Sequence, residues 1–112
     1  MSDNTPLTTS ETYELLASDR RRYVLQSLRE YRTPMALADL ATEVARREYD
    51  APVTEVSSDA IKSVSISLVH IHIPKLADAE VIHYDSDQHL VSLDQQADQI
   101  EQYPPSLAVG RG

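Results

Sequence analysis

Two histidines, His70 and His72, are the residues whose type and spacing could most directly do chemistry in this sequence. They lie near the start of the stretch VHIHIPKLADAEVIHYD, which runs from Val69 to Asp85. On a β-strand, residues two positions apart share a face, so both imidazoles could bind one metal ion. On an α-helix, at about 100° per residue, the same side chains would point roughly 200° apart. The chemistry therefore depends on the element that holds them.

The residues that precede the pair favour a helix. From Ile61 to Leu68 the apolar spacing is helical, and no turn signal follows Leu68. On the extended helical wheel, His72 falls on the apolar side and His70 on the opposite side. We therefore expect His72 to be a packed, hydrogen-bonded core residue and His70 to point outward. We predict neither a metal site nor a cofactor, because zinc sites normally show clustered ligand spacing.

Pro74 conflicts with an unbroken helix. Proline lacks the backbone N–H, and inside a helix its ring clashes with the carbonyl of the residue four positions earlier, here His70. It also pushes the preceding residue, Ile73, toward extended geometry. We expect either a kink at this position or a helix that ends near His72, followed by a new turn with Pro74 as its first residue.

The rest of the sequence predicts a single domain that is mostly helical. Residues 1–9 are expected to form a flexible arm, residues 10–103 the domain, and residues 104–112 a disordered tail. The expected elements are a short helix capped by Ser10, a helix over 19–31, a very short strand at 35–37, a helix over 38–48, a helix over 58–79 capped by Ser57 or Ser58, a β-hairpin formed by 81–85 and 89–93, and a last helix after Asp94. This order predicts a winged helix-turn-helix fold, mostly α with a small β-hairpin wing. The recognition helix would cover about 58–79 and the wing about 81–93.

Composition excludes several classes of protein. The chain has no cysteine, which rules out disulfides and thiolate sites, and both glycines lie in the last three residues, which leaves no Gly-rich phosphate loop. No Ser/His/Asp order can be singled out, so we do not expect an enzyme. No apolar run approaches the length of a membrane span, and the N-terminal residues lack the features of a signal peptide. We therefore expect a cytoplasmic protein without a membrane partner.

The charge balance is strongly acidic. The formal net charge is −8, from 18 acidic residues against eight arginines and two lysines. Scarce lysine with abundant Asp and Glu is typical of proteins that work in concentrated salt, and an ordinary acidic domain is the alternative. In molar salt the Debye length is about 3 Å, so the overall negative charge would repel DNA only weakly.

Three stretches of the sequence resemble a known family. DRRRYVLQSLRE, MALADLATEVARREYD and above all HIHIPKLADAEVIHYD are similar to the small haloarchaeal winged-helix domains, a family of unknown function whose members look like transcriptional regulators. The resemblance covers about Leu15 to Leu93, and its most specific part is His-x-His-x-Pro-Lys-Leu followed by the hairpin. More distant winged-helix regulators have a glycine before the wing, where this sequence has Glu80. A left-handed helix exit at Glu80 would be strained.

We therefore expect a regulator that binds double-stranded DNA, as a homodimer, through the outer face of the third main helix. The helical wheel places four side chains on that face, and lysine and arginine side chains nearby could bind phosphates. The predicted DNA-contacting residues are Lys62, Ser63, Ser67, His70, Lys75, Arg20, Arg21, Arg22, Arg46 and Arg47. Each arginine has an alternative interpretation, because acidic neighbours such as Asp19, Glu43 and Glu48 could pair with it.

A second hypothesis is a winged helix that serves only as a protein interaction or dimerisation module. The recognition helix offers no arginine to bind guanine, and the hairpin tip DSD is acidic, which weakens the case for DNA. Ile66 and Ile73 lie off the apolar stripe of the wheel. A pair of exposed isoleucines would favour a protein partner at this surface, and the alternative is that they pack on the first helix.

Overall fold

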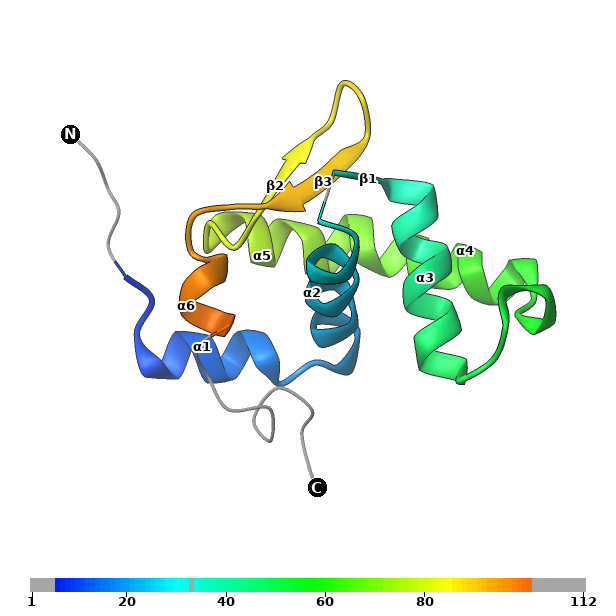
Figure 1. Cartoon of the computed structure of the whole chain (residues 1–112), viewed down its shortest axis with the longest axis horizontal. Coiled ribbons are helices and arrows are strands. Elements are labelled where there is room, and N and C mark those ends of the chain that lie inside the picture. The colour runs from blue at the N-terminus through cyan, green and yellow to red at the C-terminus, as the bar shows by residue number, and fades with distance from the viewer. Residues whose placement is uncertain (1–5, 33, 102–112) are drawn as a thin grey trace.

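The computed structural model describes residues 6–32 and 34–101 of the chain and shows a mostly helical protein with a small antiparallel sheet (Figure 1). The elements are α1 (Thr9–Leu16), α2 (Asp19–Tyr31), β1 (Met35–Ala36), α3 (Leu37–Tyr49), the 3-10 turn η1 (Val53–Glu55), α4 (Ser58–Ser67), the π-helical turn η2 (Leu68–His72), α5 (Ile73–Asp78), β2 (Ile82–Asp85), β3 (Leu90–Leu93) and α6 (Ala97–Glu101). The predicted helices, the very short strand and the hairpin are therefore confirmed to within a few residues. In the described part of the chain, no helix has the length and apolar character needed to cross a membrane.

Side-chain caps determine where the first helices begin. The hydroxyl of Ser18 accepts a hydrogen bond from the N–H of Arg21, and Ser57 caps α4 in the same way. The predicted cap of α1 at Ser10 is wrong, because the cap is Thr8. Its hydroxyl accepts from the N–H of Glu11, while the Glu11 carboxylate accepts from the N–H of Thr8. This reciprocal capping box satisfies two backbone donors at once, which favours the earlier start.

Part of the predicted arm is attached to the domain. The backbone N–H of Leu7 donates to the side chain of Gln99 at 3.1 Å, and the Gln99 amide donates back to the Leu7 carbonyl at 2.7 Å. These two bonds join the segment before α1 to α6. Residues 1–5 and the predicted tail, 104–112, lie outside the described residues.

The sheet has the strand order β1-β3-β2, with both pairs antiparallel. Val91 in the central strand is opposite Tyr84 on one side and Met35 on the other. The hairpin turn is held by the carboxylate of Asp85, which accepts from the N–H groups of Asp87 and Gln88 at 3.0 and 3.1 Å. The expected hairpin therefore gains a third strand from the short segment after α2.

One hydrophobic core lies between α2, α3, the long helix that begins at α4, and the sheet. Its fully buried side chains recur at helical spacing along the helices, and each hairpin strand contributes one, Ile82 from β2 and Val91 from β3. They include Val24, Leu25, Leu28, Leu40, Val44, Val64, Leu68, Leu76, Val81, Ile82 and Val91. Burial of this apolar surface is the main force that holds the long helix against α2 and α3.

The helical segments α4, η2 and α5 follow one another without a break and form one long helix (Figure 1). In the π turn, the N–H of Ile73 donates to the carbonyl of Leu68, five residues earlier. Pro74 lies in the first turn of α5, directly after the π turn. The predicted helix end near His72 is therefore wrong: the helix continues through the wider turn, and α5 begins at Ile73, one residue before Pro74.

The hypothesis of an exposed pair of isoleucines is wrong for Ile73, which packs inward as the alternative expected. Ile73 is 3% exposed and belongs to the core, whereas Ile66 is 52% exposed as predicted. A π turn contains one residue more than the α-helical pattern allows, so everything after it is rotated relative to a regular helical wheel. This rotation turns Ile73 inward, and within the π turn itself Val69 and Ile71 are exposed.

The exit from α5 has the left-handed geometry expected at Glu80, with φ of 62°. Two backbone bonds close it: the N–H of Glu80 donates to the Ala77 carbonyl at 2.9 Å, and that of Val81 to the Leu76 carbonyl at 3.0 Å. The Glu80 carboxylate also accepts from the side-chain amide of Gln95 at 2.6 Å. These bonds offset the strain of a residue with a β-carbon in this conformation.

Candidate nucleic-acid interface

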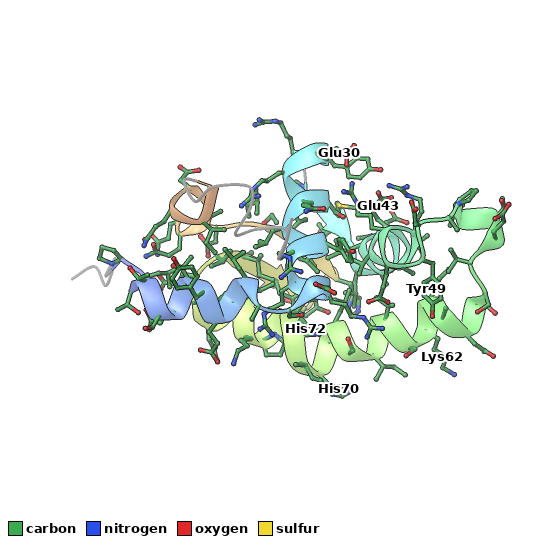
Figure 2. All side chains as sticks on the ribbon, turned by 90° about the horizontal axis from the view of Figure 1, so that it is seen from below. Glu30, Glu43, Tyr49, Lys62, His70 and His72 are labelled. Atoms are coloured by element: carbon green, nitrogen blue, oxygen red, sulfur yellow. The ribbon has the colours of Figure 1, made fainter. Side chains whose placement is uncertain are left out.

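One face of the long helix remains exposed along its whole length. Every fourth residue on this face is exposed, and we call this set the outer stripe: Lys62, Ile66, His70, Pro74 and Asp78. In Figure 2, Lys62 and His70 point to the same side of the helix, away from α3 and from Glu43. The other elements of the described chain therefore leave this face open to a partner.

The π turn is the reason that the outer stripe is straight. In a regular α-helix with about 3.6 residues per turn, every fourth residue drifts around the axis by about 40°. The wider turn from Leu68 to His72 reverses part of this drift, since it holds more residues per turn. Residues on both sides of the turn, from Lys62 to Asp78, therefore share one face.

The structure divides the predicted contacts on the long helix into two groups. Lys62, Ser63 and His70 are exposed on the outer side. The other two are engaged in contacts with neighbouring helices: the hydroxyl of Ser67 accepts from Nη1 of Arg20 at 3.0 Å, and Nζ of Lys75 lies 3.1 Å from a carboxylate oxygen of Glu14. Only the first group is available to a ligand without breaking a contact.

Arg20 joins three helices. Its Nε and Nη2 atoms donate to the two carboxylate oxygens of Glu48 at 2.7 and 3.0 Å, and its Nη1 atom reaches Ser67 on α4. The hydrogen bond that Arg20 donates to Glu48 raises the pKa of Arg20 above its ordinary value. This bidentate pair, together with the bond to Ser67, uses the whole guanidinium. Arg20 could therefore bind a phosphate, as predicted, only by breaking its ion pair with Glu48.

Arg21 is buried, at 7% exposure, and binds three acceptors. Its Nε and Nη2 atoms donate to the carbonyls of Leu15 and Glu14 at 2.8 and 2.9 Å, and its Nη1 atom donates to Nδ1 of His72 at 3.2 Å. Burial lowers the pKa of Arg21. Its guanidinium satisfies carbonyls at the end of α1 and points away from solvent, so we leave it out of the interface.

The remaining predicted arginines also have internal partners. Arg22 contacts the carboxylate of Asp19 and a backbone carbonyl of α1. Arg46 and Arg47 share the carboxylate of Glu43 at 2.5 and 3.0 Å, and Arg47 also contacts Glu30. The hydrogen bond from Arg46 is the largest cause that lowers the pKa of Glu43. The alternative interpretation of these arginines, pairing with acidic neighbours, therefore describes the positions they take in the fold.

His72 lies on the inner side of the helix, where it is half-buried. Burial lowers its pKa, and the positive charge of Arg21 lowers it further. The expected contrast between a packed His72 and an outward His70 is confirmed. Within residues 6–32 and 34–101, no three His, Cys, Asp or Glu side chains are grouped so that they could hold a metal ion.

The sequence interpretation missed two exposed apolar residues on the flanks of this face, Val69 and Ile71, at 37% and 55% exposure. The helical wheel assumed a constant 100° per residue, which the π turn breaks. Pro74 was the available signal, because a proline inside a helical pattern requires a local change in hydrogen bonding.

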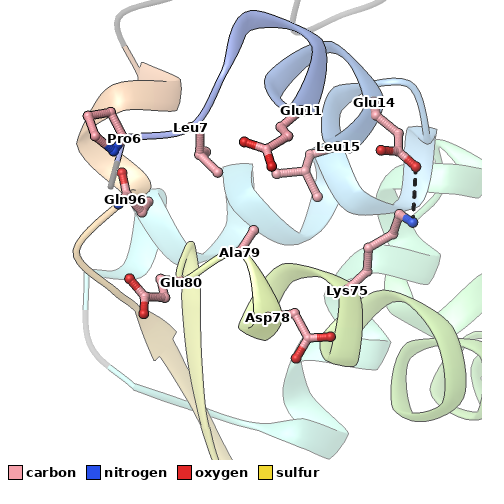
Figure 3. A pocket seen from close by; sticks show the side chains of 10 residues that line it. All are labelled: Pro6, Leu7, Glu11, Glu14, Leu15, Lys75, Asp78, Ala79, Glu80 and Gln96. Atoms are coloured by element: carbon pink, nitrogen blue, oxygen red, sulfur yellow. Dashed lines mark ion pairs between the residues drawn. The ribbon is translucent and has the colours of Figure 1, made fainter. Parts of the chain in front are cut away.

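A cavity of about 440 Å³ lies between α1 and α5, with Lys75 and Asp78 of α5 at its edge (Figure 3). Three of its acidic side chains already have partners: Glu11 caps α1, Glu14 pairs with Lys75, and Glu80 accepts from Gln95. The cavity is therefore lined by groups that hold the fold together, which gives no indication of a ligand.

Comparison with protein-family models matches residues 13–92 to a family described as a domain of unknown function, DUF7344. Neither the curated proteins nor the solved structures contain a match to this chain.

Proposed function

The chain belongs to the DUF7344 family, and we propose that it is a DNA-binding regulator of the winged-helix type. In this proposal α3 and α4 form the helix-turn-helix, α4 is the recognition helix, and the hairpin formed by β2 and β3 is the wing. The matched residues, 13–92, contain all of these elements. The organism that we expect to hold such a protein is one with a salt-rich cytoplasm.

The observation that carries the proposal is the outer stripe. A recognition helix must present one exposed face to the major groove while its other face packs on the domain. The long helix does this: Val64 and Leu68 are buried against the core, and Lys62 and His70 project from the opposite side (Figure 2).

Three exposed side chains can supply the contacts. Lys62 can neutralise a phosphate, Ser63 can donate to a phosphate or a base edge, and His70 can hydrogen-bond to either. None of them is held by a described hydrogen bond or ion pair within residues 6–32 and 34–101. The phosphate contribution is small, because the arginines first expected to add charge are paired within the fold.

Electrostatics limits the conditions under which this interface works. Asp59 lies near the start of α4, and Asp85 and Asp87 lie at the hairpin turn, so phosphates would be repelled at low ionic strength. In molar salt, charges separated by more than about 3 Å are largely screened, and hydrogen bonds within contact distance remain. We therefore propose DNA binding that tolerates high salt and depends little on net charge.

A mobility-shift titration in molar KCl tests the proposal. The DNA is first selected for binding from a pool of random genomic fragments. Lys62→Ala and His70→Ala should weaken the shift while the circular dichroism spectrum stays unchanged. Lys75→Ala is the matched control, because it removes the same charge from a lysine that already pairs with Glu14. Loss of one phosphate contact should reduce the slope of log affinity against log salt by about 1. If no selected DNA binds at any salt concentration, the proposal is wrong.

The second candidate is an interaction module that does not bind DNA. The exposed apolar side chains of Ile66, Val69 and Ile71 favour it, because a phosphate-rich groove gains little from them. Under this alternative, the same face would bind a protein, and DNA would have no effect on that complex.

A further inference from the structure

The outer stripe has exposed apolar side chains at its centre and a charged residue at each end, Lys62 and Asp78. Ile66 is 52% exposed on the stripe, and Ile71 and Val69 flank it at 55% and 37%. Pro74 adds a further exposed apolar ring. Ile66 and Pro74 therefore form an exposed apolar centre on the stripe, and Val69 and Ile71 border it on either side.

The charged ends of the stripe are arranged so that it complements itself. Lys62 lies as far before His70 along the chain as Asp78 lies after it. Ile66 and Pro74 are likewise placed symmetrically about His70. When two such helices lie antiparallel with their His70 residues side by side, each Lys62 faces the Asp78 of the other copy. The apolar side chains then meet in the middle.

We propose that two copies of this chain pair through their outer stripes, antiparallel and centred on His70, and that this pairing covers the surface of Lys62 and His70. A two-fold axis uses the same patch on both copies, so a self-complementary stripe needs no second surface. The antiparallel arrangement also places opposite helix dipole ends together. The pairing stands on the stripe alone, whereas its consequence for DNA rests on the proposed function.

The consequence is regulation by self-association. The dimer hides the recognition surface, and the monomer exposes it, so DNA and the second copy compete for one face. High salt affects the two contacts differently: it screens the Lys62–Asp78 pairs, while the apolar centre does not depend on charge. The dimer should therefore persist in molar KCl through Ile66 and its neighbours.

Disulfide trapping tests the pairing directly, because the native chain has no cysteine. In the full chain, His70→Cys places two thiols at the two-fold axis, where the Cα separation of about 4.4–6.8 Å that a disulfide requires is attainable. Ser10→Cys, exposed on α1, is the matched control. Under mild oxidation at equal concentrations, His70→Cys should form covalent dimers several times faster than Ser10→Cys. Equal rates for the two variants would overturn the pairing.

A charge exchange tests the register. Lys62→Asp and Asp78→Lys should each weaken the dimer measured by sedimentation, by about two- to fivefold for each exposed ion pair, and the double variant should recover the loss. The control combines Asp59→Lys with Lys62→Asp, which leaves the total charge unchanged. Because Asp59 lies outside the proposed pairs, this control should show no recovery. Recovery in that control, or none in the Lys62→Asp/Asp78→Lys variant, would show that the register is wrong.

Adding DNA to the wild-type protein separates this inference from the proposed function. The dimer fraction should fall as DNA is titrated in. A dimer that stays intact on bound DNA would overturn the competition and leave DNA binding in place. Trapped dimers without any DNA binding would overturn the proposed function and leave the pairing in place.

Discussion

The guanidinium of Arg21 donates a hydrogen bond from Nη1 to Nδ1 of His72, 3.2 Å away, and so joins α2 to the π turn. Arginine is a donor only, so Nδ1 of the imidazole must be unprotonated to accept this bond. Burial and the neighbouring positive charge both lower the pKa of His72. The folded protein therefore holds His72 in its neutral form.

The free energy of unfolding should fall as the pH drops below the ordinary histidine pKa of 6.5. In the unfolded chain His72 binds a proton near that value, whereas in the folded chain it does so only at lower pH. Between the two values the unfolded state holds more protons, so acid favours unfolding. Above pH 6.5 the contribution of His72 to the free energy of unfolding is fully present. Urea unfolding at a series of pH values measures the slope, and His72→Gln, which cannot titrate, should reduce it.

The matched control for this experiment is His70→Gln, because His70 is exposed on the outer side of the same helix. It should leave the pH dependence of stability as in the wild type. An equal reduction of the slope by both substitutions would contradict the role of the buried imidazole.

Arg20→Ala should lower the free energy of unfolding by about 1 kcal/mol, because it removes the link between α2, α3 and α4. This figure is discounted for solvent screening, since the side chains of Arg20 and Glu48 remain 27% and 25% exposed. Chemical denaturation in low and in molar KCl gives the measurement. Arg46→Ala removes an ion pair that lies within one helix, and a loss as large as that of Arg20→Ala would argue against the importance of the link between helices.

Glu80→Gly and Glu80→Ala should differ in thermal stability by about 1 kcal/mol in favour of glycine. Both variants lose the hydrogen bond with Gln95, so the difference isolates the strain of a β-carbon at φ of 62°. Thermal unfolding should show a melting temperature about 4–8 °C higher for Glu80→Gly than for Glu80→Ala. Equal melting temperatures would mean that the left-handed exit relaxes in the alanine variant.

Much of the fold could be predicted from local signals. Ser18 and Ser57 are good helix caps, and both helices begin where these residues place them. The alternating strands on either side of Asp85–Gln88 and the extended Met35–Ala36 segment also follow from local patterns. These features depend on residues that are close together in the sequence, so one sequence is enough to predict them.

The rest depends on contacts between distant residues or on a change in helical phase. The partner of Arg20 is 28 positions away, at Glu48, and only the folded arrangement of α2 and α3 brings them together. Ile73 was assigned to the wrong face because a wheel with constant spacing cannot represent a π turn. For the candidate interface, the positions of Lys62 and His70 could be predicted, whereas the internal pairing of the arginines required the structure.

The π turn lets the two halves of the long helix take different rotations about the helix axis. The half from Ser58 to Ser67 is oriented by α3, while the half from Ile73 to Asp78 is oriented by the sheet. Substitutions that reshape one half for a new partner therefore need not disturb the other. Relatives that differ before Leu68 could acquire new targets and keep the same junction with their hairpin.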